Sequence, residues 1–126
     1  MSVLVDTSVW IDYFRGEGSV DTLDRLIDQN LVVVNELILA ELLPFLYQKR
    51  QRKLAALLQE LQLQPMCINW TEIIEMQTVC LRNGINGVGI PDLMIAQNVL
   101  QGGLSLFSRD KHFSLMATCI TLSMYE

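Results

Sequence analysis

Residues 2–14 read SVLVDTSVWIDYF, a short apolar run that stops at an aspartate and passes directly into a helical pattern. The run Ser2–Asp6 predicts a strand, because β-branched residues favour a buried, pleated chain. Residues 7–14 supply a capping hydroxyl followed by apolar side chains at helical spacing. The segment therefore predicts a strand whose carboxyl end meets the start of a helix at Asp6.

The same alternation of strands and helices continues along the rest of the chain. Further strands are predicted at Leu31–Val34, Met66–Ile68, Leu104–Ser108 and Thr118–Ser123. Further helices are predicted at Asp21–Gln29, Leu37–Tyr47, Lys49–Leu63, Thr71–Arg82, Asp92–Leu100 and Asp110–Met116. Pro44 is expected to kink or end its helix. This order indicates an α/β fold with a largely parallel central sheet, in a single domain spanning residues 1–126.

Composition narrows the class of protein. Hydrophobic residues make up 51% and charged residues 18% of the 126, which suits a packed core and not a disordered tail. The most apolar stretch, Leu31–Tyr47, carries Asn35, Glu36 and Glu41, and these polar groups would be costly in a bilayer. No basic leader precedes the first strand, and the cysteines are scattered. We expect a cytoplasmic protein with no membrane contact and with free thiols at Cys67, Cys80 and Cys119.

Charge also limits the possible partners. The net charge of −5 argues against a protein that grips nucleic acid with a broad basic face. It remains compatible with an enzyme that meets phosphates through bound cations. His112 is the only histidine, which nearly excludes a zinc site built from histidine and cysteine.

Three acids fall where parallel sheets place their ligands. Asp6 ends the first strand, Asp92 lies in the first turn of a helix, and Asp110 follows the strand Leu104–Ser108. Ligands bind at the carboxyl edge of such sheets, so the three side chains can converge. Each acid also has an ordinary explanation as a turn residue, a first-turn aspartate or a helix cap.

Glu41 is unusual because it lies inside an apolar helix with no basic residue within helical reach. A buried carboxylate without a partner is unfavourable, so a partner is expected from elsewhere. A divalent cation is one candidate, and an arginine such as Arg15 or Arg109 is the other. Four carboxylates with no cysteine or histidine ligand favour Mg²⁺ or Mn²⁺, which can activate water for attack on a phosphate.

The order of these acids resembles a known family, the PIN domains, and in particular the VapC-type toxins. LVDTSVWIDYFRG resembles the start of the domain, and LILAELL resembles its second motif with Glu41 as the acid. PDLMIAQNVL resembles the third motif, with Asp92 at the metal-ligand position. LFSRDKHF resembles the fourth, with Asp110 as the acid and Phe113 as its aromatic companion. The resemblance covers essentially the whole chain.

The resemblance implies a PIN-like α/β/α sandwich and an Mg²⁺- or Mn²⁺-dependent endoribonuclease. It implies that Asp6 and Asp92 bind metal directly and that Glu41 and Asp110 act through water. It gives Ser8 a supporting role, and Ser108 stands where a threonine is commoner. A homodimer, an RNA substrate and an antitoxin that blocks or fills the active site are also implied. Pro44 and Phe45 depart from the pattern, where a small residue is often found.

Several other residues have two interpretations. The basic run Lys49–Lys53 can contact RNA phosphates, but a solvated helix start is the favoured interpretation. Arg15 and Arg109 are better candidates for phosphate contacts, with an ion pair to a carboxylate as the alternative. His112 is either a proton donor or, as we favour, a surface residue beside a buried Phe113. Trp10 and its aromatic neighbours Tyr13 and Phe14 can stack on bases, although packing in the core or a dimer interface is favoured.

Two competing functions come from other classes. A PIN-like module can bind RNA or protein without cleaving it. Phosphoryl transfer to Asp6, as in receiver domains or phosphatases, is the other possibility. Asp6-Thr7-Ser8 lacks the second aspartate of that phosphatase motif, and only Lys111 lies near the place where a receiver needs its lysine. The sequence leaves open which RNA and which bond would be cut, which antitoxin binds, and whether one metal ion or two are held.

Overall fold

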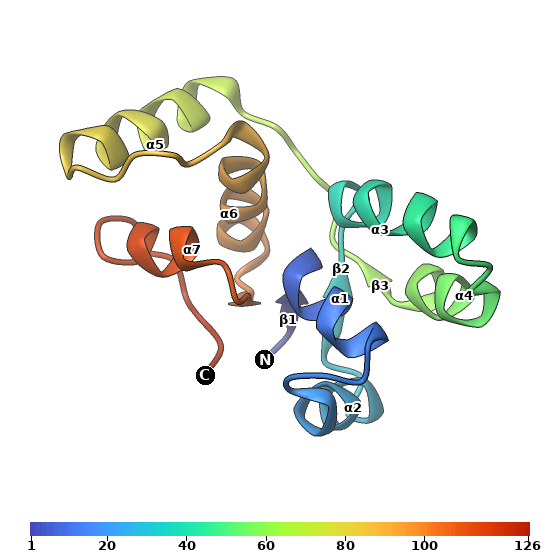
Figure 1. The fold of residues 1–126 in the computed structure, drawn as a ribbon. Coiled ribbons are helices and arrows are strands. Elements are labelled where there is room, and N and C mark those ends of the chain that lie inside the picture. Colours follow the sequence, from blue (N-terminus) through green and yellow to red (C-terminus); the bar gives the residue numbers. More distant parts are fainter.

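A four-stranded parallel sheet forms the centre of the protein, in a computed structural model that describes all 126 residues (Figure 1). Its strands lie in the order β3-β2-β1-β4. They are β1 (Val3–Val5), β2 (Val32–Val34), β3 (Gln62–Leu63) and β4 (Ser105–Phe107). Every pairing is parallel, with Leu4 of β1 opposite Val33 on one side and Leu106 on the other. The expected α/β class and parallel sheet are confirmed.

Seven helices connect and cover the strands: α1 (Thr7–Phe14), α2 (Val20–Asp28), α3 (Glu36–Gln48), α4 (Arg52–Glu60), α5 (Trp70–Arg82), α6 (Ile90–Gly102) and α7 (Lys111–Met116). The chain steps in one direction from β1 to β2 to β3 and then returns across the sheet to β4. Parallel crossovers are right-handed, so this reversal sends α1–α4 to one face and α5–α6 to the other. Figure 1 shows the two helix groups on either side of the strands.

The reversal creates a topological switch point between β1 and β4. The loops that leave these neighbouring strands diverge toward opposite faces, and the carboxyl edge between them is the usual place for a ligand crevice. Asp6 follows β1 and Ser108 follows β4, so the switch point lies among the residues singled out in the sequence.

The core beneath this edge is a single cluster of 29 buried apolar residues that extends from Val3 to Leu122. Trp10 and Phe113 are among its largest fully buried side chains. Trp10 also stacks on Phe14 and meets Tyr13 edge to face. The prediction that this aromatic group packs inside the protein is therefore confirmed. No helix is both long enough and apolar enough to cross a membrane.

The third strand differs from the prediction. Gln62 and Leu63, assigned to the end of a helix, pair with Val33 and Val34, whereas Met66–Ile68 forms no strand. Pro65 has no N–H and cannot continue the ladder. The backbone beyond it is held by side chains of α6, since Asn98 and Gln101 donate to the carbonyls of Pro65 and Cys67.

The last predicted strand is reduced to one bridge. Residues 118–123 form no strand, and only Met124 bridges to Leu106. The amide of Ile120 still donates to the carbonyl of Met116, so helix-like turns use the backbone that a strand would need.

Helix boundaries also shift in the second quarter of the chain. Pro44 does not end α3, which continues to Gln48. Pro44 has no N–H, so the carbonyl of Ala40 lacks its usual helical donor. Both residues are exposed, and water can donate to this carbonyl instead. The next helix begins at Arg52 and not at Lys49, because Arg50 adopts a positive φ of 57° between the two helices.

Candidate active site

Asp6 lies at the end of β1 and is the buried acid of the site, with 6% of its surface exposed. Its Oδ2 accepts hydrogen bonds of 2.9 Å from the hydroxyls of Ser8 and Ser108. The two donors come from the start of α1 and the end of β4, so they fix the carboxylate from both sides of the switch point.

Asp92 is the third residue of α6 and is half-buried. Its Oδ2 accepts a long 3.4 Å hydrogen bond from the amide of Gly89. Burial raises the pKa of Asp92 most, the Gly89 amide opposes this, and the charges of Asp110 and Asp6 raise it further. The charges of Asp6 and Asp110, which come from two other elements, therefore act on Asp92.

Asp110 caps α7, because its Oδ1 accepts from the amide of His112 at 2.9 Å. Asp110 is therefore a helix cap, as one of its two interpretations predicted. This role does not prevent it from also belonging to the acidic site. The same oxygen lies 3.0 Å from Nδ1 of His112. We expected His112 to be a surface residue beside a buried Phe113, and it is partly exposed, but it also contacts the acid two residues before it. Phe113 beside it is buried as expected.

Glu41 does not have the environment that was predicted. Its side chain is exposed and not buried in an apolar helix, because Ile38, Leu42 and Leu46 form the inward stripe of α3. Its Oε1 accepts a 2.9 Å hydrogen bond from the hydroxyl of Thr7. Thr7 directly follows Asp6, so Glu41 lies near the end of β1, but it is not one of the three residues whose ligand atoms lie together, and the argument from burial was mistaken.

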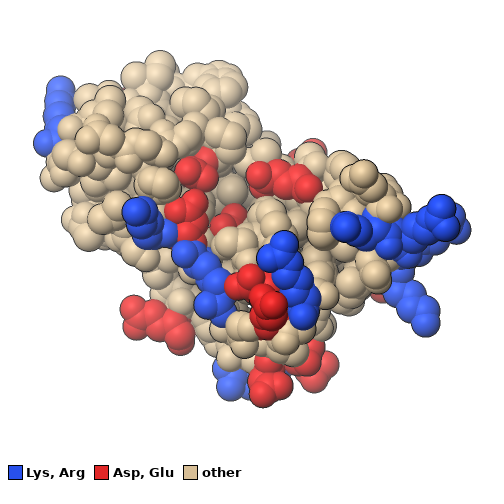
Figure 2. All heavy atoms as spheres, in the orientation of Figure 1, with Lys and Arg blue, Asp and Glu red and all other residues tan.

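Figure 2 shows acidic side chains gathered around a hollow near the centre of one face. Asp92, Asp110 and His112 each offer a ligand atom, and these atoms all lie within 4.8 Å of one another. A bound cation would relieve the mutual repulsion of these carboxylates, which form no ion pair with a lysine or arginine. The donor set therefore fits a divalent metal ion.

The two candidate phosphate-binding arginines have different surroundings. Arg109 forms a 2.9 Å ion pair with Asp12 and donates to the hydroxyl of Ser19 at 2.8 Å. Arg109 thereby fastens the turn between α1 and α2 to the end of β4, and its ion-pair partner is not one of the four acids. Arg15 is exposed and forms no ion pair.

The basic run Lys49–Lys53 is fully exposed around the start of α4, in agreement with the favoured interpretation. Figure 2 shows basic side chains projecting from this end of the protein, away from the central acidic hollow.

Sequence reasoning missed a set of buried amides that positions α6. Asn35 and Asn98 are almost completely buried, and Nδ2 of Asn35 donates to Oδ1 of Asn98 at 3.0 Å. Gln97 exchanges hydrogen bonds with the backbone of Asn69 and also donates to Glu72. Two adjacent amides in an otherwise apolar helix were the available signal, because buried polar groups need partners. Asn35 also caps α3, because its side chain accepts from the amide of Ile38.

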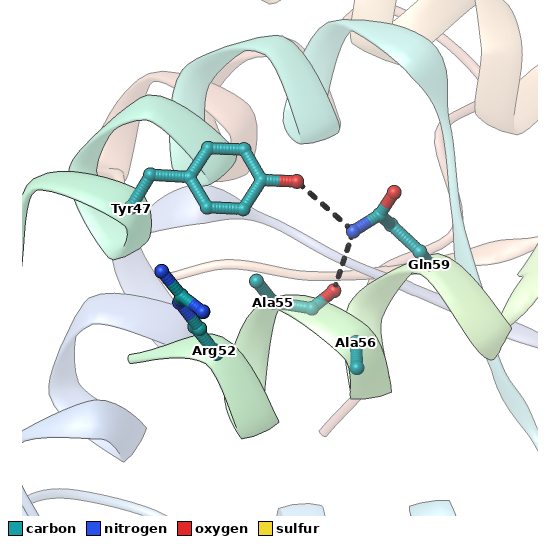
Figure 3. A pocket seen from close by; sticks show the side chains of 5 residues that line it. All are labelled: Tyr47, Arg52, Ala55, Ala56 and Gln59. Carbon is teal, nitrogen blue, oxygen red and sulfur yellow. Dashed lines mark hydrogen bonds between the residues drawn. The ribbon is translucent and has the colours of Figure 1, made fainter. Parts of the chain in front are cut away.

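Four hollows lie outside the acidic site, and two of them adjoin α3 and α4. One of about 520 Å³ lies between α3 and α4, where Gln59 donates to Tyr47 and to the carbonyl of Ala55 (Figure 3). Another of about 390 Å³ is lined by apolar residues of α1, α3 and α4, together with Arg15, Lys49 and Gln51. Neither is lined by any of the four acids.

The fold and site define an α/β protein with a parallel sheet and an acidic crevice at its switch point. Residues 3–118 match the PIN domain, and the chain belongs to this family. No sequence among the curated proteins matches it.

Solved structures share the fold at low sequence identity. A chain of VapBC2 from Rickettsia felis, bound to a DNA fragment from its promoter, is 19% identical, with a TM-score of 0.77 over 99% of this chain and 98% of that one. A chain of VapBC-1 from nontypeable Haemophilus influenzae is 18% identical, with a TM-score of 0.73 over 100% and 98%. VapC20 of Mycobacterium tuberculosis, a sarcin-ricin loop cleaving toxin, is 16% identical, with a TM-score of 0.62 over 96% and 98%.

Proposed function

We propose that the protein is a metal-dependent endoribonuclease and the toxin of a toxin–antitoxin pair. The observation that carries the proposal is the convergence of Asp6 and Asp110 on Asp92 in a PIN domain. The fold shared with VapBC structures supports the toxin role. RNA cleavage is proposed by analogy with the Mycobacterium protein of similar fold, which is a sarcin-ricin loop cleaving toxin.

Asp6 and Asp92 are the proposed direct metal ligands, with Asp110 and Glu41 acting directly or through water. Bound Mg²⁺ or Mn²⁺ would polarise the phosphate and favour ionisation of a water nucleophile. Ser8 and Ser108 hold the Asp6 carboxylate in place, because both hydroxyls donate to its Oδ2. Neither hydroxyl donates to Oδ1 of Asp6. Thr7 restrains Glu41 at the edge of the crevice.

The test is cleavage of RNA by the purified chain with Mg²⁺ or Mn²⁺. Asp92→Asn should reduce the rate by at least about a thousandfold, since it removes a ligand of the ion that stabilises the developing charge. Full activity in excess chelator would exclude the mechanism.

Glu60→Gln is the matched control for loss of one acid. Glu60 is exposed, forms no ion pair, and ends α4 just before β3, at the opposite edge of the parallel sheet. Its activity should equal that of the unmodified chain. Normal cleavage by Asp92→Asn would contradict this mechanism, because cleavage would then use other groups. It would also exclude the alternative of a binding module, because the protein would still cleave RNA.

An antitoxin partner belongs to the same proposal. The apolar hollow between α1, α3 and α4 carries Phe45, which is 37% exposed, beside the cations Arg15 and Lys49. This chemistry fits an amphipathic partner segment with acidic residues. Phe45→Glu should weaken binding of the protein encoded by the adjoining gene by at least about tenfold. The new carboxylate would lie in the interface and repel the acidic residues of that partner. RNA cleavage should be unchanged.

A homodimer is proposed through α5. This helix exposes Trp70, Ile74 and Leu81, each more than half accessible. Clustered exposed apolar residues indicate an interface. Ile74→Glu should convert the dimer to a monomer in light scattering, and a monomeric unmodified chain would refute the assignment.

A further inference from the structure

We propose that His112 supplies a nitrogen ligand to the cation held by Asp92 and Asp110, and that this ligand makes the site favour a first-row transition-metal ion over Mg²⁺. The inference rests on the metal site of the proposed function and specifies its chemistry. It does not require that the chain cleave RNA.

The first support is the spacing of the three side chains. One ligand atom from each of Asp92, Asp110 and His112 lies within 4.8 Å of the others. Ligand atoms on opposite sides of one small divalent ion are about 4.2 Å apart, because each bond is about 2.1 Å long. The side chains of His112 and Asp110 are 28% and 35% exposed, so small rotations can close the difference.

The second support is the 3.0 Å separation of Nδ1 of His112 from Oδ1 of Asp110. Two ligand atoms at right angles on one small divalent ion are about 3.0 Å apart, because each bond is about 2.1 Å long. In the tautomer that carries its proton on Nε2, the lone pair of Nδ1 is available to a cation that Asp110 also binds.

The third support is the space beside Nε2. Gly87 has a φ of +83°, and a Cβ at that position would lie 3.3 Å from this nitrogen. Glycine therefore keeps that side of the imidazole ring uncrowded, so Nε2 can carry the ring proton while Nδ1 faces Asp110. The loop that contains Gly87 is held against α5, because Gln77 donates to the carbonyl of Val88 at 2.8 Å.

The predicted selectivity follows from ligand chemistry. Mg²⁺ prefers oxygen ligands and retains several waters. Combined imidazole and carboxylate ligands are characteristic of first-row transition metals. Mn²⁺ is the weakest binder of that series, so a preference for Mn²⁺ over Mg²⁺ is a demanding test.

Pulsed electron paramagnetic resonance of Mn²⁺ bound to the full chain, without a histidine tag, tests the assignment directly. His112 is the only histidine, so any modulation from a coordinated imidazole ¹⁴N must come from it. We expect this modulation in the unmodified chain and expect its loss in His112→Asn. Bound Mn²⁺ without nitrogen modulation, or no binding of Mn²⁺, would overturn the proposal.

His112→Asn and His112→Ala separate ligation from positioning. The asparagine amide can still donate to Asp110 but provides no imidazole nitrogen, whereas alanine removes both contacts. The Kd for Mn²⁺ should rise by about tenfold or more in both variants, while the Kd for Mg²⁺ should change by less than about threefold in His112→Asn. Unchanged Mn²⁺ affinity in His112→Asn would mean that His112 only orients Asp110.

The outcomes are distinct from those of the proposed function. A chain that shows nitrogen modulation but cleaves no RNA supports the metal assignment and refutes the nuclease. A chain that cleaves RNA with no nitrogen at its Mn²⁺ refutes only the assignment of His112.

Discussion

The Ser108 hydroxyl donates a 2.9 Å hydrogen bond to Oδ2 of Asp6, across 102 positions of sequence. The same hydroxyl oxygen accepts the amide of Asp110 at 3.0 Å. One small side chain therefore connects two of the acids and joins the ends of β1 and β4. Such support determines how precisely carboxylates are presented to a cation.

Ser108→Ala should weaken Mn²⁺ binding by about 10- to 100-fold, since it removes a group that orients a metal ligand. The free energy of unfolding should fall by about 1–2 kcal/mol, because Asp6 and the Asp110 amide each lose a partner. Titration calorimetry and urea unfolding measure the two effects. Ser108→Thr keeps the hydroxyl and should restore both, and an alanine variant with normal affinity would contradict this role.

Asp92→Asn should stabilise the metal-free protein at neutral pH. Burial and the neighbouring acids raise the pKa of Asp92 in the folded state, so the folded state holds this proton more tightly than the unfolded state. The free energy of unfolding therefore falls as pH rises from the ordinary carboxyl pKa of about 4 through the raised pKa. Melting curves in chelator should coincide at low pH and separate above that range. Parallel curves at all pH values would contradict the prediction.

Tyr13 should be identifiable in an alkaline titration. Burial, the hydrogen bond to Asp24 and the charges of Asp24 and Asp28 raise the pKa of Tyr13 to about 12. Its contribution to stability is present below the unfolded pKa of about 10 and is lost as pH rises through the folded value. Absorbance of the phenolate should show one step near pH 12 that Tyr13→Phe removes. Asp24→Asn should move that step to lower pH.

Asn98→Ala should lower the free energy of unfolding by about 2–3 kcal/mol, because it leaves the buried Nδ2 of Asn35 without its partner and removes the hydrogen bond to the carbonyl of the exposed Pro65. Removing Asn35 as well should cost less than the sum of the single changes. Gln101→Ala on the exposed side of the same helix is the control, with an expected loss below about 1 kcal/mol. Additive losses in urea unfolding would mean that the two amides act independently.

Arg109 is expected to act through its ion pair and not through RNA. Arg109→Gln and Asp12→Asn should then alter cleavage to the same extent, because each frees the turn after α1. Arg15→Gln, which breaks no ion pair, should reduce the salt dependence of RNA binding by about 0.7 in the slope of log K against log salt if Arg15 contacts one phosphate. An equal reduction in Arg109→Gln but not in Asp12→Asn would reassign Arg109 to phosphate binding.

Much of the fold followed from local signals. Continuous apolar runs at β1, β2 and β4 and periodic helices between them were sufficient to predict a parallel sheet and to place Asp6 and Asp110 at its carboxyl edge. The error at β3 came from two residues, Gln62 and Leu63, that are exposed and carry no apolar pattern. Their pairing depends on where α4 ends and on the position of Pro65. Both are determined by the tertiary structure and not by a local sequence pattern.

The site was predictable by position and less so by environment. Glu41 lies beside Asp6 through Thr7, but its burial was misjudged because an almost wholly apolar helix conceals which stripe faces inward. The contact of His112 with Asp110 depends on how α7 starts, and no periodic pattern of residues signals it. The pairing of Arg109 with Asp12 joins distant segments and needed the assembled fold.

The order of the strands has a consequence for the chain during its synthesis. β4 pairs with β1, and Asp110 follows β4, so Asp6 and Ser108 cannot meet until β4 has left the ribosome. A growing chain that already carries Asp6, Glu41 and Asp92 still lacks its complete acidic crevice. The site that joins Asp6 to Ser108 therefore cannot assemble on the nascent chain until the segment through residue 110 has emerged from the ribosome.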